Sequence, residues 1–248
     1  MNLVSIIMPY YNKEFYFKES INSVLNQSYK NFELIIIFDD IPEKYEKFKT
    51  LIPKDKRIKI FKNKKNLGAG KSRNFGIKKS KGEFIAFIDS DDLWKKNKLS
   101  LQINFMQKNN YFFTYTHYKT FKLGNPVKKS VVAPSKFNFK SFIKNTSIGT
   151  STMIVKRAKI NNIKFSNTKI CEDYYYKCQL LKRIGFAYCC PRFLTEYQIR
   201  KNSLQSNRIR NLYWIWKINK TLNRFNILKN LMSIFLISLN SLNKYGFR

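Results

Sequence analysis

The chain has 248 residues, and its 48 Lys and Arg against 15 Asp and Glu give a formal net charge of +33. Residues 1–92 hold a net charge of +6, whereas residues 93–248 hold +27. Because 44% of the residues are hydrophobic and 16% are aromatic, the composition excludes a disordered basic tail and predicts one large α/β domain, alone or with an extension.

Short apolar runs alternate with amphipathic stretches over the first 92 residues. Strands are predicted at residues 4–8, 32–38, 57–61 and 84–88, and helices at residues 14–26, 43–51 and 70–79. This βαβαβαβ order requires a mostly parallel sheet with helices on both faces. Ligands of such sheets bind beyond the carboxyl ends of the strands, so the residues after each strand are the first candidates for a site.

The order is less regular beyond residue 93. The predicted elements are a helix at 95–108, an aromatic strand at 111–121, a loop around Pro126 and Pro134, a strand at 151–155, a helix at 174–184 and a strand at 193–199. The four cysteines form no Cys-x-x-Cys pair and His117 is the only histidine, which argues against a structural zinc site.

Two helices, separated near residues 223–226, are predicted from about residue 207 onward. In the second helix apolar residues recur at spacings of three and four and form one face, while Asn and Ser occupy much of the other: Phe225, Leu228, Met232, Phe235, Leu239 and Leu242. This face fits either packing against the rest of the chain or a twin copy, or attachment to an anionic membrane surface through the neighbouring basic and aromatic residues.

Location and charge give weaker indications. No secretory signal precedes the first apolar run, and no stretch reaches the ~18 uninterrupted apolar residues of a spanning helix, so we expect a cytoplasmic protein, with peripheral attachment to the inner face of the plasma membrane left open. Lys outnumbers Arg 38 to 10, as AT-rich coding sequence produces, so we infer no nucleic-acid partner from the charge alone.

An acidic cluster follows the fourth predicted strand. Asp89, Asp91 and Asp92 are three carboxylates within four residues, which repel one another unless a cation lies among them. Mg²⁺ and Mn²⁺ prefer oxygen ligands, and Mg²⁺ typically takes one or two carboxylates together with phosphate oxygens. The alternative is that these residues, Asp92 in particular, cap the following helix.

Polar residues follow the other strands as well. Asp39 and Asp40 could accept a hydrogen bond from a base imide or a ribose hydroxyl, or could serve as turn or cap residues. Gly70 and Arg73 belong to the segment GAGKSRN, a weak phosphate-binding signal that lacks the spacing of a P-loop.

A second acidic pair is prominent because the surrounding segment is so basic. Glu172 and Asp173 are two of only three acids after residue 92, the third being Glu196. They precede a predicted helix, so they are candidates for catalysis or for capping of that helix.

Residues 3–106 resemble the nucleotide-sugar-binding half of the family-2 glycosyltransferases, which have the GT-A fold. The segments that carry the resemblance are VSIIMPYYNK, SVLNQSYKNFELIIIFDD, NLGAGKSRNFGIKKSKGEFIAFIDSDD and LWKKNKLSLQ. Later in the chain, GTSTMIVKR and the Glu-Asp pair are similar to the family's acceptor-side segments. The resemblance implies an α/β, Rossmann-like catalytic domain at residues 1–205, divided at residue 106, followed by a basic amphipathic helical extension at 206–248.

The resemblance also implies roles for individual residues. Pro9, Tyr11 and Asn12 would line the base and ribose site, Asp40 would read the base with Asp39 beside it, and Gly70 and Arg73 would lie near the donor. Asp89-Ser90-Asp91 matches the family's DxD motif, with Asp92 adjacent, which would hold Mn²⁺ or Mg²⁺ on the donor diphosphate. Arg200 lies in YQIRKNSLQS, which departs from the family's Tyr-Arg-x-His pattern because it has no His.

The implied reaction is a metal-assisted single displacement with inversion. Asp173, with Glu172 beside it, would act as the catalytic base. A UDP-sugar is the favoured donor, although Ile41-Pro42-Glu43 replaces the family's usual Gly-Ser-Thr and weakens the assignment of the nucleobase. The acceptor would be a saccharide or lipid-linked saccharide in bacterial surface-polysaccharide synthesis, and a homodimer is left open. The competing hypothesis is a catalytically inactive, GT-A-like basic protein that binds a membrane surface or nucleic acid.

Overall fold

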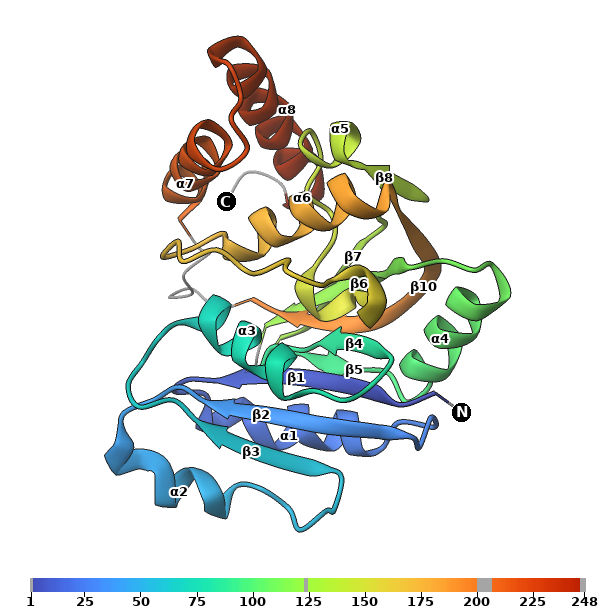
Figure 1. Ribbon diagram of the computed structural model, residues 1–248, viewed down its shortest axis with the longest axis vertical. Helices are drawn as coiled ribbons and strands as arrows, with labels where there is room; N and C mark the ends of the chain where they lie inside the picture. The colour runs from blue at the N-terminus through green and yellow to red at the C-terminus, as the bar shows by residue number, and fades with distance from the viewer. Residues whose placement is uncertain (1, 123–124, 200–206, 246–248) are drawn as a thin grey trace.

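The computed structural model describes residues 2–122, 125–199 and 207–245, in which ten strands form one sheet (Figure 1). The strands are β1 Val4–Tyr10, β2 Phe32–Phe38, β3 Ile58–Lys62, β4 Phe84–Phe87, β5 Leu93–Trp94, β6 Phe113–Lys122, β7 Asn125–Val131, β8 Lys136–Asn138, β9 Ile154–Lys156 and β10 Phe186–Gln198. The helices are α1 Glu14–Leu25, α2 Tyr45–Thr50, α3 Ala69–Lys79, α4 Lys98–Lys108, α5 Phe139–Phe142, α6 Glu172–Ile184, α7 Arg208–Thr221 and α8 Ile227–Tyr245.

The first four long strands form the parallel arrangement that the sequence predicts. The sheet order is β3-β2-β1-β4-β9-β6-β10-β5, with β7 paired to β6 and β8 paired to β10. Strands β3, β2, β1 and β4 run parallel, so Val4 lies opposite Phe32 on one side and Phe84 on the other. Every residue of β2 is buried, as expected for a parallel strand covered on both faces.

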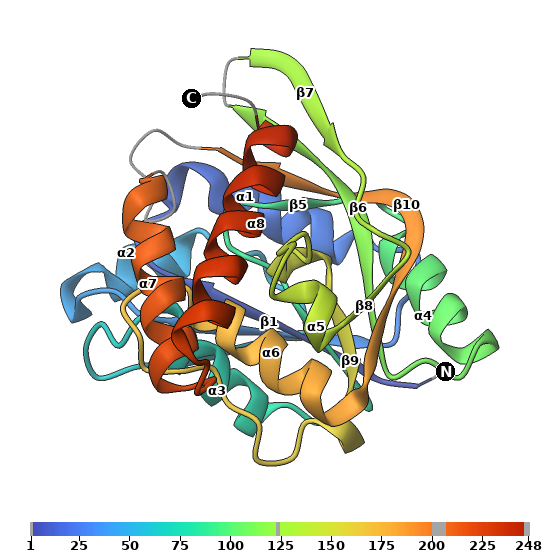
Figure 2. The same ribbon diagram turned by 90° about the horizontal axis from the view of Figure 1, so that it is seen from above.

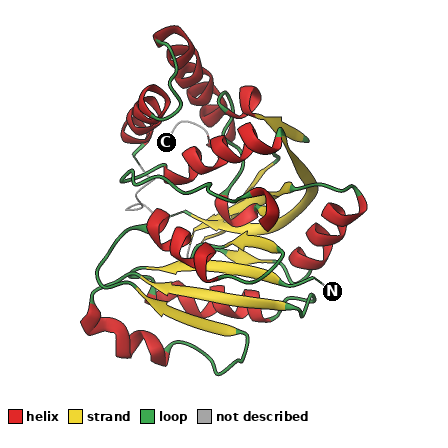
Figure 3. Ribbon diagram, in the orientation of Figure 1, coloured by secondary structure: helices red, strands yellow, loops and turns green. Residues whose placement is uncertain are grey.

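Helices cover both faces of this sheet (Figure 3), and the alternation of side chains along β1 divides the core between them. Ile6 and Met8 point into a cluster with residues of α1, α2 and α4, including Phe17 and Leu99. Ile7 points to the opposite face, where residues of α6, α7 and α8 are buried. The mixed α/β fold with C-terminal helices is thus confirmed.

The second half of the sheet differs in detail from the predicted elements. The region around Pro126, expected to be a loop, contains β7, which pairs antiparallel with β6 at the margin of the sheet. A proline is tolerated there because β7 is an edge strand, in which some backbone N–H groups form no hydrogen bond to a neighbouring strand. The predicted strand at 151–155 begins instead with a 3₁₀ turn, Thr150–Thr152, and only Ile154–Lys156 is extended.

The two C-terminal helices are present and lie side by side on α6, as Figures 1 and 2 both show. The Tyr174 hydroxyl of α6 donates a hydrogen bond of 2.8 Å to the Asn219 side chain of α7. In the described ranges, no helix combines the length and the apolar character needed to span a bilayer.

Close packing of α3 on β1 depends on Gly76. A Cβ atom built at Gly76 would lie 2.5 Å from Cγ2 of Ile7, well inside van der Waals contact. Alanine is ordinarily favoured over glycine within a helix by about 0.5–1 kcal/mol, but overpacking of a core costs about 1–3 kcal/mol. The two effects have opposite signs, so the change in stability on substitution of Gly76 by alanine tests this close packing.

We predict that Gly76→Ala lowers the free energy of unfolding by up to about 2 kcal/mol in urea denaturation, because the collision of the methyl group with Ile7 outweighs the gain in helix propensity. Lys78→Ala, at an exposed position of the same helix, is the control and should change stability by less than about 0.5 kcal/mol. An increase in stability for Gly76→Ala would contradict the packing described.

Candidate active site

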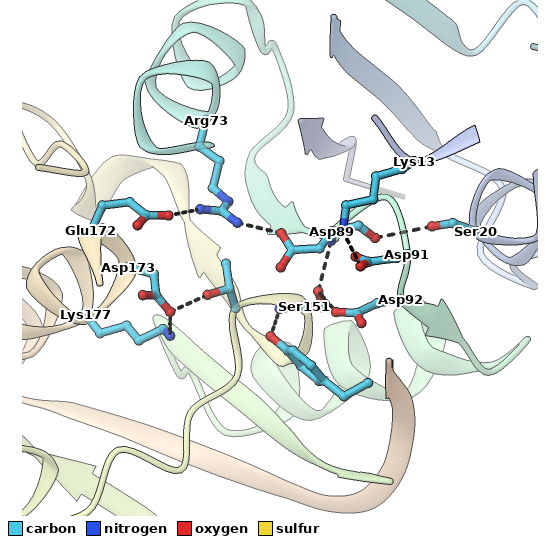
Figure 4. A network of polar contacts seen from close by, with 12 residues as sticks. Lys13, Ser20, Arg73, Asp89, Asp91, Asp92, Ser151, Glu172, Asp173 and Lys177 are labelled. Carbon is cyan, nitrogen blue, oxygen red and sulfur yellow. Dashed lines mark hydrogen bonds and ion pairs between the residues drawn. The ribbon is translucent and has the colours of Figure 1, made fainter. Parts of the chain in front are cut away.

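Segments from both halves of the chain meet at the carboxyl ends of β1 and β4 (Figure 4). Lys13 follows β1, and Asp89, Asp91 and Asp92 follow β4. The second half contributes the 3₁₀ turn at Thr150–Thr152 and the first turn of α6, which begins with Glu172 and Asp173. The site therefore lies at the sheet edge where parallel α/β folds bind ligands.

The loop after β1 has a fixed shape. Asn12 adopts a left-handed backbone conformation with φ 46°, and its N–H donates a hydrogen bond of 3.0 Å to Oδ2 of Asp40. The other oxygen of Asp40 accepts a 2.8 Å bond from the N–H of Ile41. Tyr11 is left 51% exposed beside this loop, and Pro9 is half-buried in β1. An exposed tyrosine ring on a rigid loop provides a flat surface for a planar group.

Asp39 holds the loop that leads into α3. Its side chain accepts hydrogen bonds from Asn63 Nδ2 at 2.7 Å, from Leu67 N at 2.8 Å and from Gly68 N at 2.8 Å. Gly68 has φ +86°, a conformation that favours glycine. Both oxygens of Asp39 are engaged with the chain itself, as are both oxygens of Asp40, and the two residues are buried to a similar degree, so these contacts favour neither as the one that contacts a base.

Each acid after β4 has its own partner. Asp89 accepts a charged hydrogen bond of 2.5 Å from Arg73, and Asp91 pairs with the Lys13 ammonium. Asp92 is 2% exposed and accepts bonds from the Ser151 hydroxyl at 2.6 Å and the Gln198 N–H at 3.0 Å. Burial, together with the charges of Asp91 and Asp89, raises the pKa of Asp92 well above its ordinary value.

Arg73 joins this cluster to the second half of the chain. Its side chain is 5% exposed, and it donates to Glu172 at 2.8 Å as well as to Asp89. Gly70, one turn earlier in α3, allows this approach, because a Cβ there would lie 2.7 Å from Cγ of Glu172. Burial raises the pKa of Glu172, and the adjacent Asp173 adds to this rise, against the opposing effect of the Arg73 charge.

Asp173 is held in its ionised form. It accepts hydrogen bonds of 2.6 Å from the Lys177 ammonium, one helical turn later, and of 2.8 Å from the Thr150 hydroxyl. Burial by itself would raise the pKa of Asp173, but the Lys177 charge and hydrogen bond, the Arg73 charge and the Thr150 hydrogen bond outweigh it and lower the pKa to about 2. This carboxylate is therefore ionised at neutral pH.

The arrangement of the acids fits a divalent cation that takes most of its ligands from water and phosphate oxygens. No group of three or more His, Cys, Asp or Glu side chains within residues 2–122, 125–199 and 207–245 is arranged to hold a metal ion. Asp89 and Asp91 have side chains 31% and 10% exposed, whereas Asp92 is directed to Ser151 and Gln198. Two carboxylates suffice for Mg²⁺ bound to phosphate oxygens and water, so Asp89 and Asp91 are the candidates for such an ion, and the Asp92 carboxylate is engaged by Ser151 and Gln198.

The structure brings most of the candidate residues together and adds others. Buried Ser90 lies within the acidic cluster, and Arg200 falls outside the described residues. Several residues that contact the acids of the site were not predicted from the sequence, among them Lys13, Thr150, Ser151 and Lys177. Lys177 had a detectable signal, because acid and base four residues apart on a helix form a pair.

The sequence matches the family model described as "Glycosyl transferase family 2" over residues 5–164. One relative, the UDP-Glc:alpha-D-GlcNAc-diphosphoundecaprenol beta-1,3-glucosyltransferase WfgD of Escherichia coli, is 39% identical over 87% of this chain and 85% of its own length. Another, the putative teichuronic acid biosynthesis glycosyltransferase TuaG of Bacillus subtilis, is 33% identical over 92% of this chain and 91% of its own.

Solved structures share the fold at lower identity. TarS of S. aureus in complex with UDP-GlcNAc aligns with a TM-score of 0.71 and 21% identity over 100% of this chain and 73% of that one. The mannosyltransferase PcManGT of Pyrobaculum calidifontis, in complex with GDP-Man and Mn²⁺, aligns with a TM-score of 0.67 and 14% identity over 99% of this chain and 76% of that one.

We predict that Arg73→Met lowers the free energy of unfolding at pH 7.5 by about 3 kcal/mol, because Asp89 and Glu172 lose their shared cation. A buried carboxylate without a cation has a raised folded-state pKa, which costs stability above that pKa, so the loss should shrink as the pH falls to 5. Lys71→Met, at an exposed position of α3, should change stability by less than about 0.5 kcal/mol. Equal losses for the two variants, or a loss independent of pH, would contradict the role of Arg73.

Proposed function

The chain belongs to glycosyl transferase family 2 and is a glycosyltransferase, and we propose that it transfers a sugar from a UDP-sugar to a hydroxyl group of a lipid-linked saccharide. The donor and acceptor classes rest on the name of the WfgD relative, which specifies UDP-Glc and a diphosphoundecaprenol-linked sugar. The TuaG relative supports a setting in surface-polysaccharide synthesis. We assign the reaction to the cytoplasm or to the inner face of the plasma membrane.

The observation that carries this proposal is the connection of two acid groups through Arg73. Asp89, beside the candidate cation ligand Asp91, and Glu172, beside Asp173, are both bonded to the same guanidinium. A donor diphosphate at the first group and an acceptor hydroxyl at the second would then flank one sugar. Two sets of acids with different environments are suited to different tasks in one reaction.

Asp89 and Asp91 would hold Mn²⁺ or Mg²⁺, which when bound stabilises negative charge on the leaving diphosphate. Lys13 and Arg73 hold two further positive charges beside these acids. Tyr11, Asn12 and Asp40 would contact the base and ribose at the end of β1 and β2. The chain thus offers a nucleotide subsite next to a phosphate subsite, in the order in which a nucleotide sugar presents these groups.

Asp173 would act as the general base. The acceptor hydroxyl passes its proton to the Asp173 carboxylate as the acceptor oxygen bonds to the anomeric carbon, and the bond from that carbon to the diphosphate oxygen breaks with its electron pair. With one base and no protein nucleophile in this scheme, the displacement is single and the anomeric configuration inverts. A general base typically contributes a factor of about 10²–10⁴ in rate.

We predict that Asp173→Asn lowers kcat about 10²–10⁴-fold and leaves donor binding nearly unchanged, because it removes only the proton acceptor. Asp91→Asn should instead weaken Mn²⁺-dependent donor binding. The measurements are UDP release with a panel of UDP-sugars and a synthetic lipid-diphosphate GlcNAc acceptor, and donor affinity by calorimetry. Asp55→Asn makes the same chemical change in an ion pair with Arg57 outside the site and should retain activity; transfer insensitive to both site variants would remove the mechanism.

The hydrogen bond from Lys177 to Asp173 predicts a pH effect. Because the base acts when it is deprotonated, kcat/KM falls as the pH drops through the Asp173 pKa, which Lys177 keeps low at about 2. In Lys177→Met the pKa should rise, so the acidic limb of the kcat/KM profile should move up by at least about one pH unit. Lys177→Arg keeps the charge and should restore the wild-type profile; an unmoved limb in Lys177→Met would show that Lys177 does not set this pKa.

A further inference from the structure

Helix α8 has its apolar residues on the outside. Its solvent-facing side is a continuous stripe at spacings of three and four, which we call the α8 stripe and which consists of Leu228 (74% exposed), Leu231 (53%), Met232 (48%), Phe235 (62%) and Leu239 (42%). Single exposed apolar residues are ordinary on a protein surface, but a contiguous row of large ones marks an interaction surface.

The opposite side of α8 packs on the domain through both apolar and polar side chains, with Ile237 buried in the core and Ile234 packed against it. Asn230 Nδ2 donates a 3.0 Å hydrogen bond to the carbonyl of Trp216, and the Ser233 hydroxyl donates a 2.6 Å bond to the carbonyl of Ile143. Asn240 Nδ2 donates a 3.0 Å bond to the carbonyl of Lys144. These bonds fix the rotation of the helix about its axis, so the outward position of the α8 stripe follows from satisfied polar contacts.

The charge around the stripe indicates what covers it. Residues 207–245 contain seven Lys and Arg and no Asp or Glu. Lys217, Lys220 and Arg224 are exposed on α7 and on the turn between the two helices. A second copy of the chain would bring its own charge of +33, and like charges oppose association. An anionic lipid surface attracts each nearby Lys or Arg by about 1 kcal/mol.

We propose that the α8 stripe and the basic residues of α7 and α8 dock the protein on an anionic lipid bilayer. The helix lies in the plane of the interface, with Phe235 and its neighbours inserted below the headgroups and the basic side chains at headgroup level. Through the Tyr174 to Asn219 hydrogen bond, α7 is fastened to α6, the helix whose first turn holds Asp173 (Figure 2). The docked helices would therefore lie next to α6, on the side of the site that the proposed function assigns to the acceptor.

The test is co-sedimentation of the full chain with two kinds of vesicle. One is phosphatidylcholine alone, and the other contains about 30% phosphatidylglycerol, which makes its surface anionic. We expect binding to the anionic vesicles that weakens when NaCl is raised, since salt screens the basic residues. Phe235→Glu should lower the affinity at least about tenfold, because it places a charge in the inserted stripe.

Phe15→Glu is the matched control, because Phe15 is 84% exposed on α1, which covers the other face of the sheet, and it should bind as the wild type does. Equal binding by wild type and Phe235→Glu, or no binding by the wild type, would overturn the proposal. A wild-type dimer in analytical ultracentrifugation that Phe235→Glu converts to a monomer, without vesicle binding, would assign the stripe to a second copy instead. Because no donor or acceptor is present, these outcomes are independent of the transfer assay.

Discussion

The Arg73 guanidinium is the contact on which the proposed site depends. It lies on α3, almost fully buried, and it bonds to Asp89 at the end of β4 and to Glu172 at the start of α6. Without a shared cation, these two carboxylates from opposite halves of the chain would repel each other. The same contact requires Gly70, since a larger residue would push α3 away from Glu172. The first and second halves are thus joined by charge at the point where a sugar would be transferred.

The other acids of the site follow the same rule of local neutralisation. Lys13 neutralises Asp91, and Lys177 with Thr150 keeps Asp173 ionised. Asp92 instead accepts hydrogen bonds from the Ser151 hydroxyl and the Gln198 N–H, and its pKa is raised. The acids therefore differ in protonation behaviour although they lie close together, because each has a different first neighbour.

The C-terminal helices combine basic residues with an outward apolar surface. In α8 the side chains of Asn230, Ser233 and Ile237 face the domain, and the α8 stripe faces outward, where an ordinary surface helix is polar. A basic, acid-free segment with an outward apolar stripe combines the two features that favour binding to an anionic lipid surface. Such a surface, fastened to α6, is suited to the lipid-linked acceptor that we propose.

The sequence by itself determined the parallel half of the sheet and the family. Continuous apolar runs such as residues 32–38 predict buried strands, and polar residues after them predict the ligand edge. It could not assign Asp39 to the loop before α3 or Asp92 to Ser151, because those partners are 28 and 59 residues away in the chain. The periodicity of the sequence also predicted an apolar face on α8, but it did not show whether that face points toward the domain or toward solvent. Only the tertiary structure decided these points, because hydrogen-bond partners and exposed faces depend on which distant segments pack together.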